Sequence, residues 1–191
     1  MLIMNTVTNK HRILFTIFVL VFSVFIFTGG VWAVEDYGAE GVQEKDQFTL
    51  EEMLKYAIQD EYLAKAEYEL IMQKFGEQRP FSNIMQAEEY HIEILLPLFT
   101  KYNIEIPLDL SDQHVILPDD IKTALETGVN AEIVNIEMYE KFLDKEDLPA
   151  DVAEVFEELK RGSENHLEAF RDNLNRSEKR NYQNSRRRNS N

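Results

Sequence analysis

The sequence predicts an all-α protein: a four-helix bundle made of two antiparallel helix hairpins joined by a long crossover. Apolar residues recur at three- and four-residue spacings over four long segments, and no β-branched alternating run competes with them. About five residues separate the helices within each pair, whereas some 15 residues separate the two pairs. Short connections favour antiparallel neighbours, and a long one permits a crossover.

The first helix is expected over 49–76. Thr49 followed by Glu52 is a capping-box signature, and an amphipathic pattern follows it. The second helix is expected over about 81–102, after a short turn that contains Pro80. These two segments form the first predicted hairpin.

The third helix is expected to begin at Pro118 and the fourth at Pro149, because proline suits the first turn of a helix. The linker over 103–117 reaches roughly 50 Å when extended, and a 22-residue helix is about 33 Å long. The linker can therefore run the full length of the bundle, which places the third helix parallel to the second. His114, within this linker, is expected to be a solvated loop residue.

Residues 1–33 predict a signal peptide. Lys10 and Arg12 precede an apolar run over 13–28, and Val31-Trp32-Ala33 offers small residues for cleavage after position 33. An uncleaved membrane anchor is the alternative, because the apolar stretch is just long enough to span a bilayer. In both cases we expect a secreted or extracytoplasmic domain, and the absence of cysteine fits this.

Charge divides the rest of the chain. We expect a linker over 34–48, the bundle over 49–175 and a basic disordered tail over 176–191. Residues 34–175 carry 12 Lys/Arg against 34 Asp/Glu, whereas the tail carries six basic residues against Glu178. The acidic body argues against nucleic-acid binding. The tail has no apolar period, and it is either a solvated end or a contact for an anionic cell surface.

Each predicted helix carries a polar cluster near the middle of its apolar face. The members are Glu61, Glu88, His91, Glu132, Asn135 and His166. Burying a lone carboxylate costs several kcal/mol, and three together cost more. No Lys or Arg occupies these inward positions, since Lys65 lies beside the stripe and can turn outward. A bound cation is the remaining candidate, and three carboxylates with two imidazoles suit iron or manganese and also accept zinc.

The two hairpins also repeat a spacing. Glu61 is followed seven residues later by Tyr68, and Glu132 is followed seven residues later by Tyr139. A duplicated hairpin would give this pattern, and so would coincidence in a helical, Glu-rich chain. Both tyrosines suit core packing, and both also suit a hydrogen bond to a ligand carboxylate.

Glu61-x-x-Ala64-x-x-x-Tyr68 and Glu88-x-x-His91 resemble the first two helices of the ferritin-like di-iron carboxylate superfamily. That superfamily places one Glu on each of two helices and Glu-x-x-His on the other two. The stretches "RPFSNIMQAEEYHIEILLPLFTKYNI" and "LKRGSENHLEAF" are similar, more narrowly, to a bacterial branch known as domain of unknown function 2202. The resemblance covers about residues 50–174, and it implies an oxidase or peroxidase that acts on oxygen or peroxide.

The fourth helix departs from that pattern. Ser163 stands three residues before His166, where a second Glu-x-x-His requires a carboxylate, and Glu164 points about 100° away. Two metal ions about 3.5 to 4 Å apart normally need bridging carboxylates. Asn135 either supplies an amide oxygen or orients an imidazole. The sequence therefore leaves three possibilities for the site: an asymmetric pair of metal ions, a single metal ion, or no metal.

Three functions follow. The first is an exported metal-carboxylate oxidase or peroxidase, with Glu61, Glu88, His91, Glu132 and His166 as ligands and an external electron donor. The second is a non-catalytic metal-binding module at the cell surface. The third is a metal-free structural bundle, in which Glu88 and His91 form a hydrogen-bonded pair and the inner carboxylates find protein donors.

Overall fold

The chain folds into four α-helices, and no strand forms within residues 37–43 and 45–188, which the computed structural model describes. The helices are α1 (Leu50–Phe75), α2 (Phe81–Tyr102), α3 (Ile121–Leu143) and α4 (Ala150–Arg188). Two short 3-10 helices accompany them, η1 (Gly38–Val42) before α1 and η2 (Ser111–Gln113) between α2 and α3. The all-helical prediction is confirmed.

Side chains cap the starts of α1 and α3. The Thr49 hydroxyl accepts a hydrogen bond from the Glu52 backbone N–H at 3.2 Å, and the Glu52 carboxylate accepts one from the Thr49 backbone N–H at 2.8 Å. This is the capping box that the sequence predicts. At α3, the Asp120 carboxylate accepts a hydrogen bond from the Thr123 N–H at 2.8 Å. Each cap satisfies a backbone donor that the helix itself leaves unpaired.

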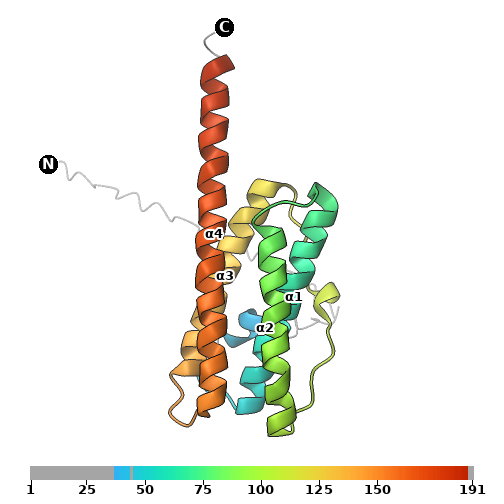
Figure 1. Cartoon of the computed structure of the whole chain (residues 1–191), viewed down its shortest axis with the longest axis vertical. Coiled ribbons are helices and arrows are strands. Elements are labelled where there is room, and N and C mark those ends of the chain that lie inside the picture. The colour runs from blue at the N-terminus through green and yellow to red at the C-terminus, as the bar shows by residue number, and fades with distance from the viewer. Residues whose placement is uncertain (1–36, 44, 189–191) are drawn as a thin grey trace, which may run out of the picture. The chain divides into compact units, whose positions relative to one another are not determined.

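The helices pack as two pairs, α1 with α2 and α3 with α4, and the pairs meet through α1 with α3 and α2 with α4. In Figure 1, α1 runs upward, α2 returns downward, α3 runs downward and α4 runs upward. The segment between α2 and α3 climbs back along the outside of α1, which η2 contacts. Each pair is thus an antiparallel hairpin, and a long connection joins them.

Two apolar clusters fill the interior, and we name them by their place in Figure 1. The lower cluster contains, among others, Leu54, Ile58, Leu95, Phe99, Met138, Phe142, Phe156 and Leu159. The upper cluster contains Tyr68, Ile71, Phe81, Ile84, Ala124, Leu125 and Phe170. On α1 the lower cluster ends at Ile58 and the upper one has its first buried member at Tyr68, so Glu61 lies between them. The predicted polar cluster is therefore a layer between two apolar ones.

Residues 37–43 and 45–48 pack against the helices, although the sequence predicts a linker over 34–48. The η1 helix contacts α1 and α3, and Tyr37, Val42 and Phe48 are buried. The Ala39 N–H donates a hydrogen bond to the Asp60 carboxylate at 2.9 Å. The segment has too few apolar residues to show a period, so its role becomes visible only once α1 and α3 are in place.

The C-terminal segment also differs from expectation, because α4 continues as a helix to Arg188 where the sequence predicts a disordered tail from 176. No glycine or proline follows Gly162 to interrupt the helix. Arg176 pairs with Asp172 one turn earlier at 3.3 Å. Figure 1 shows the upper part of α4 extending past the ends of the other three helices.

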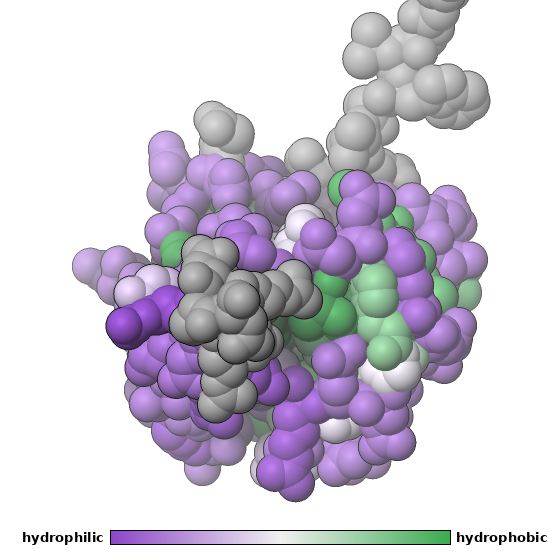
Figure 2. Space-filling view, turned by 90° about the horizontal axis from the view of Figure 1, so that it is seen from above, coloured by the Kyte–Doolittle hydropathy of each residue, from purple (hydrophilic) through white to green (hydrophobic). Residues whose placement is uncertain are grey.

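The face seen from above is mostly hydrophilic, with hydrophobic residues gathered near its middle (Figure 2). Among the described residues, no helix combines the length and apolar character needed to cross a membrane. The signal peptide or anchor predicted over 1–33 lies outside the described residues.

Candidate metal centre

The polar layer brings together all five side chains that the sequence proposes as metal ligands. Glu61 comes from α1, Glu88 and His91 from α2, Glu132 from α3 and His166 from α4. None of them exposes more than 7% of its surface. The apolar stripe of each helix turns these residues inward, because a side chain three or four positions from a core residue shares its face.

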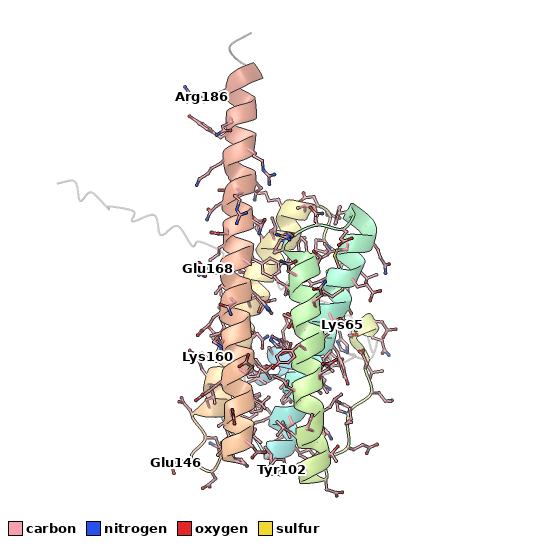
Figure 3. The ribbon with its side chains drawn as sticks, in the orientation of Figure 1. Lys65, Tyr102, Glu146, Lys160, Glu168 and Arg186 are labelled. Atoms are coloured by element: carbon pink, nitrogen blue, oxygen red, sulfur yellow. The ribbon has the colours of Figure 1, made fainter. Side chains whose placement is uncertain are left out.

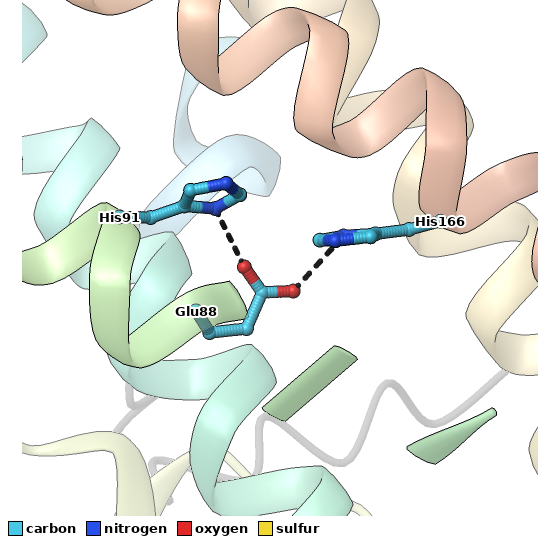
Figure 4. A group of neighbouring side chains, drawn as sticks. All are labelled: Glu88, His91 and His166. Carbon is cyan, nitrogen blue, oxygen red and sulfur yellow. Dashed lines mark hydrogen bonds and ion pairs between the residues drawn. The ribbon is translucent and has the colours of Figure 1, made fainter. Parts of the chain in front are cut away.

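Glu88 lies at the centre of the layer and faces both histidines. Its Oε2 is 2.8 Å from His91 Nδ1, and its Oε1 is 3.2 Å from His166 Nδ1 (Figure 4). The two imidazole rings have centroids 5.6 Å apart and an interplanar angle of 29°. One carboxylate therefore connects the two helix pairs through imidazoles on α2 and α4.

The other two carboxylates lie at the outer sides of the histidines. Glu61 Oε2 is 3.0 Å from His91 Nδ1, and Glu132 Oε1 is 3.5 Å from His166 Nδ1. Each Nδ1 thus faces two carboxylates from two different helices. The site alternates acid and imidazole groups across all four helices.

Tyrosine hydroxyls hold the outer carboxylates from the opposite helix pair. Tyr139 on α3 donates a hydrogen bond to Glu61 Oε1 at 2.8 Å, and Tyr68 on α1 donates one to Glu132 Oε1 at 3.2 Å. The repeated spacing of Glu and Tyr therefore places each tyrosine on the glutamate of the other repeat. The sequence supplies both tyrosines as candidates, but the exchange of partners appears only in three dimensions.

The half of the site on α3 and α4 is less complete than the half on α1 and α2. Ser163 is buried and donates a hydrogen bond to the Leu159 carbonyl of its own helix at 3.3 Å. Glu132 Oε2 and Asn135 Oδ1 are buried acceptors without a hydrogen-bond partner among the described residues. A buried acceptor without a donor is unfavourable, so this half has capacity for a bound cation or a hydrogen-bond donor.

The carboxylates affect one another through their burial and charge. Burial raises the pKa of Glu61 to about 7, and the nearby Glu88 charge adds to this rise. Burial also raises the pKa of Glu132. Burial acts in the same direction on Glu88, but its hydrogen bonds with His166 and His91 overcome the effect and lower its pKa to about 2. Glu88 is the carboxylate that stays ionised most strongly.

The histidines supply positive charge that the sequence argument leaves out. Burial lowers the pKa of His91, but the Glu61 carboxylate opposes this and the result is about 10. The pKa of His166 also rises to about 10 despite burial, because Glu132 and Glu88 accept its hydrogen bonds. Without a metal, two imidazolium ions can therefore balance much of the acidic charge. A bound cation is therefore not the only group that can neutralise the buried carboxylates, contrary to the expectation from the sequence.

The donor set nevertheless fits a metal ion. Glu88, His91 and His166 offer ligand atoms that all lie within 4.8 Å of one another. Two adjacent ligands that are each about 2.1 Å from an ion are themselves about 3 Å apart, which is close to the carboxylate–imidazole separations here. Oxygen and imidazole ligands together suit iron, manganese or zinc. The unpartnered Glu132 Oε2 provides a further oxygen.

Two neighbours of the site, Gly162 and Asp60, escape the sequence reasoning. A Cβ on Gly162 would lie 2.5 Å from His91 Nε2, so this glycine makes room for the imidazole. Asp60 is a second acid beside Glu61, and burial raises its pKa well above the usual range. Outside the site, His114 lies in the predicted connection between α2 and α3, where it is half-buried and stacks on Tyr37 with ring centroids 4.1 Å apart. A glycine inside an amphipathic helix is the one signal that could have drawn attention to Gly162.

Lysines near the site lie at the surface. Lys65 turns outward, as expected, and pairs with the exposed Glu89 at 3.1 Å. Lys160 pairs with Glu140 on the outside of the second hairpin at 3.0 Å. Figure 3 labels both lysines along the outer sides of the helices. Among the described residues, neither ammonium group pairs with a carboxylate of the polar layer.

Fold and site together define an all-helical protein with a buried glutamate–histidine cluster. Residues 51–188 match a family model described as an uncharacterized protein domain (DUF2202), and the chain belongs to this family. The matched range includes the extension of α4 beyond the other helices. "Uncharacterized protein MJ0754" of Methanocaldococcus jannaschii is 31% identical over 127 residues, which is 59% of this chain and 68% of that protein. No solved structure matches the chain.

Proposed function

We propose that this chain is a ferritin-like four-helix bundle that binds iron in its interior. The observation that carries the proposal is the position of Glu88, whose two oxygens face imidazole nitrogens from α2 and α4. Glu61 and Glu132 lie around this centre. Alternating buried carboxylates and imidazoles offer oxygen and nitrogen ligands to a metal ion, and iron accepts both kinds of ligand.

Topology supports the ferritin-like assignment. Two antiparallel hairpins joined by a crossover, with Glu on α1 and α3 and Glu-x-x-His on α2, follow the arrangement of ferritin-like metal carboxylate proteins. The contacts of α1 with α3 and of α2 with α4 bring the four polar positions to one level. Ser163 is the departure from that arrangement.

Metal analysis tests the proposal. The apo protein is titrated with ferrous iron without oxygen, and bound metal is counted after desalting, with manganese and zinc in parallel titrations. We expect uptake by the unaltered chain and loss of uptake in E88Q/H91Q, because both changes remove central donors. E89Q is the matched control, since Glu89 is the exposed neighbour that pairs with Lys65. Undiminished uptake by E88Q/H91Q, or none by the unaltered chain, contradicts the proposed site.

A second function, reaction of the bound iron with oxygen or peroxide, is favoured by the two tyrosine contacts. Non-haem iron supplies one-electron chemistry toward oxygen. The hydroxyls of Tyr139 and Tyr68 orient the outer carboxylates, and the apolar clusters keep bulk water from the layer. The chain has no cysteine to hold a second redox centre, so electrons must come from an external donor. Consumption of oxygen or peroxide by the iron-loaded protein tests this, and bound iron without consumption leaves the non-catalytic binding function.

We further propose that the domain is exported and that the end of α4 contacts an anionic cell surface. All six basic residues that follow the acidic body lie within 176–188, among them Arg186 (Figure 3). Positive charge on a projecting helix attracts anionic lipid or cell-wall polymer. Cell fractionation tests export. Salt-sensitive binding to anionic vesicles, lost when residues 176–191 are removed, tests the surface contact.

A further inference from the structure

The candidate ligands repeat between the two halves of the polar layer, since Glu61 corresponds to Glu132 and His91 to His166, but Glu88 has no matching carboxylate on α4. His91 on α2 and His166 on α4 occupy matching places on either side of Glu88. Glu88 precedes His91 by three residues, and Ser163 precedes His166 by three residues. A residue three positions before a histidine shares its face of the helix. Ser163 is therefore the α4 counterpart of Glu88.

Ser163 cannot do what Glu88 does. It is 1% exposed, so it lies inside the layer and not at its edge. Its hydroxyl donates to the Leu159 carbonyl at 3.3 Å, which turns the oxygen back onto α4. A neutral hydroxyl on a short side chain also brings no negative charge between two cations.

Glu88 is the carboxylate that faces both imidazoles, whereas each outer carboxylate faces one. Two divalent ions held about 3.5 to 4 Å apart repel strongly, and bridging carboxylates normally offset that repulsion. This layer has one carboxylate placed to bridge. The outer glutamates each commit one oxygen to a tyrosine hydroxyl from the opposite helix pair.

We infer that the centre holds one metal ion and not two, and that Ser163 is the residue that sets this number. The inference rests on the proposed metal-binding function. The single ion takes Glu88, His91 and His166 as its central ligands, because their donor atoms all lie within 4.8 Å of one another. The unpartnered Glu132 Oε2 and Asn135 Oδ1 lie in the same half of the layer as Ser163, where no second bridging carboxylate is present among the described residues.

Three substitutions at Ser163 separate charge from volume. S163E supplies the missing carboxylate, S163Q supplies the same volume without the charge, and S163A removes only the hydrogen bond to Leu159. We expect one ion per chain for the unaltered protein, S163A and S163Q, and two for S163E. Without metal, S163E should melt at a lower temperature than S163Q, because it adds a fourth buried carboxylate to the layer. Added metal should raise the melting temperature of S163E more than that of S163Q.

The measurement is anaerobic titration with ferrous iron, with bound metal counted per chain and helical content checked by circular dichroism. Manganese loading of the unaltered chain gives a second reading that requires no variant to fold, because an isolated ion and a coupled pair differ in their electron paramagnetic resonance spectra. Two ions in the unaltered chain overturn this inference and leave the proposed function standing. No bound ion overturns both. A folded S163E that still binds one ion shows that Ser163 does not set the number.

Discussion

At the scale of single residues, glycines determine where the rings of residues on neighbouring elements can lie. Gly162 leaves room for the imidazole of His91, and Gly128 does the same for the ring of Phe170. The helical spacing of apolar residues predicts that His91 is on the inner face of α2. The same spacing does not predict the role of Gly162, because that role depends on His91, which lies on another helix.

Replacing Gly162 with alanine should weaken metal binding. Alanine favours a helix interior over glycine by about 1 kcal/mol. Its Cβ would nevertheless lie 2.5 Å from His91 Nε2, so the imidazole has to move. Because misplaced ligands typically cost 10- to 100-fold in affinity, we expect a loss of roughly tenfold or more in iron titrations of G162A.

G128A is the control for this substitution. Its added Cβ would lie 2.7 Å from the Phe170 ring, inside the upper apolar cluster. We expect G128A to lower the melting temperature and to change iron affinity much less than G162A does. Equal affinity losses in both variants would show that general strain, and not the position of His91, controls binding.

At the scale of elements, the sequence determines the helices better than the segments between them. Helix-start signals and apolar spacing place all four helices, since both are local, although α3 begins at Ile121 and not at Pro118 as predicted. The sequence predicts a linker before the first helix because the packing of η1 depends on contacts with α1 and α3, for which the sequence gives no local signal. The end of α4 reads as disordered because a polar helix without a packed face has no apolar period.

Glu67 lies on α1, where α1 contacts the segment between α2 and α3, and it should make the stability of the fold depend on pH. Burial raises the pKa of Glu67 to about 7, although a hydrogen bond from the Ile116 backbone opposes this. The folded state therefore binds the proton more tightly than the unfolded chain does. Ionisation of Glu67 therefore lowers the free energy of unfolding progressively as pH rises from about 4.5 to 7, and the whole loss is present above pH 7.

E67Q should remove this dependence, because glutamine resembles the protonated acid. We expect E67Q to be more stable than the unaltered chain at pH 8 by about 1 to 2 kcal/mol, and the two to be nearly equal at pH 5. Urea unfolding at both pH values measures the difference. A constant gap between the two proteins at pH 5 and pH 8 would show that Glu67 does not titrate in this range. E69Q serves as the control, since Glu69 is exposed on the same helix.

The segment that packs on α1 and α3 should also contribute to stability. Val42 is 1% exposed, so V42A leaves a cavity in the lower cluster. We expect a loss of about 1 to 2 kcal/mol in the free energy of unfolding, as for other buried aliphatic truncations. A true linker would tolerate the change. Thermal and urea unfolding of V42A beside Q43A, which alters an exposed neighbour, measure the contribution.

At the scale of the whole molecule, the four helices act together as one proton-binding network. His166 on α4 faces Glu88 on α2 as well as Glu132 on α3, so no hairpin completes the site alone. The sequence supplies the five candidate ligands because buried polar residues at helical spacing are unusual. It cannot show that the imidazoles are charged in the apo protein, because that depends on distances between helices.

Metal binding should therefore release protons and strengthen as pH rises. The pKa values of His91 and His166 are about 10 in the apo protein, so both imidazoles carry an additional proton at pH 7. A metal ion requires the neutral imidazole, so each ligating histidine loses that proton. Falling pH favours the apo form, and affinity should rise from pH 6 to pH 9. About two protons per ion come from the histidines, and more are released below pH 7, where Glu61 is also protonated. Calorimetric titration in buffers of different ionisation enthalpy counts the protons. H166Q should release about one proton fewer than the unaltered chain, whereas an affinity that does not change with pH would exclude these two histidines as the ligands.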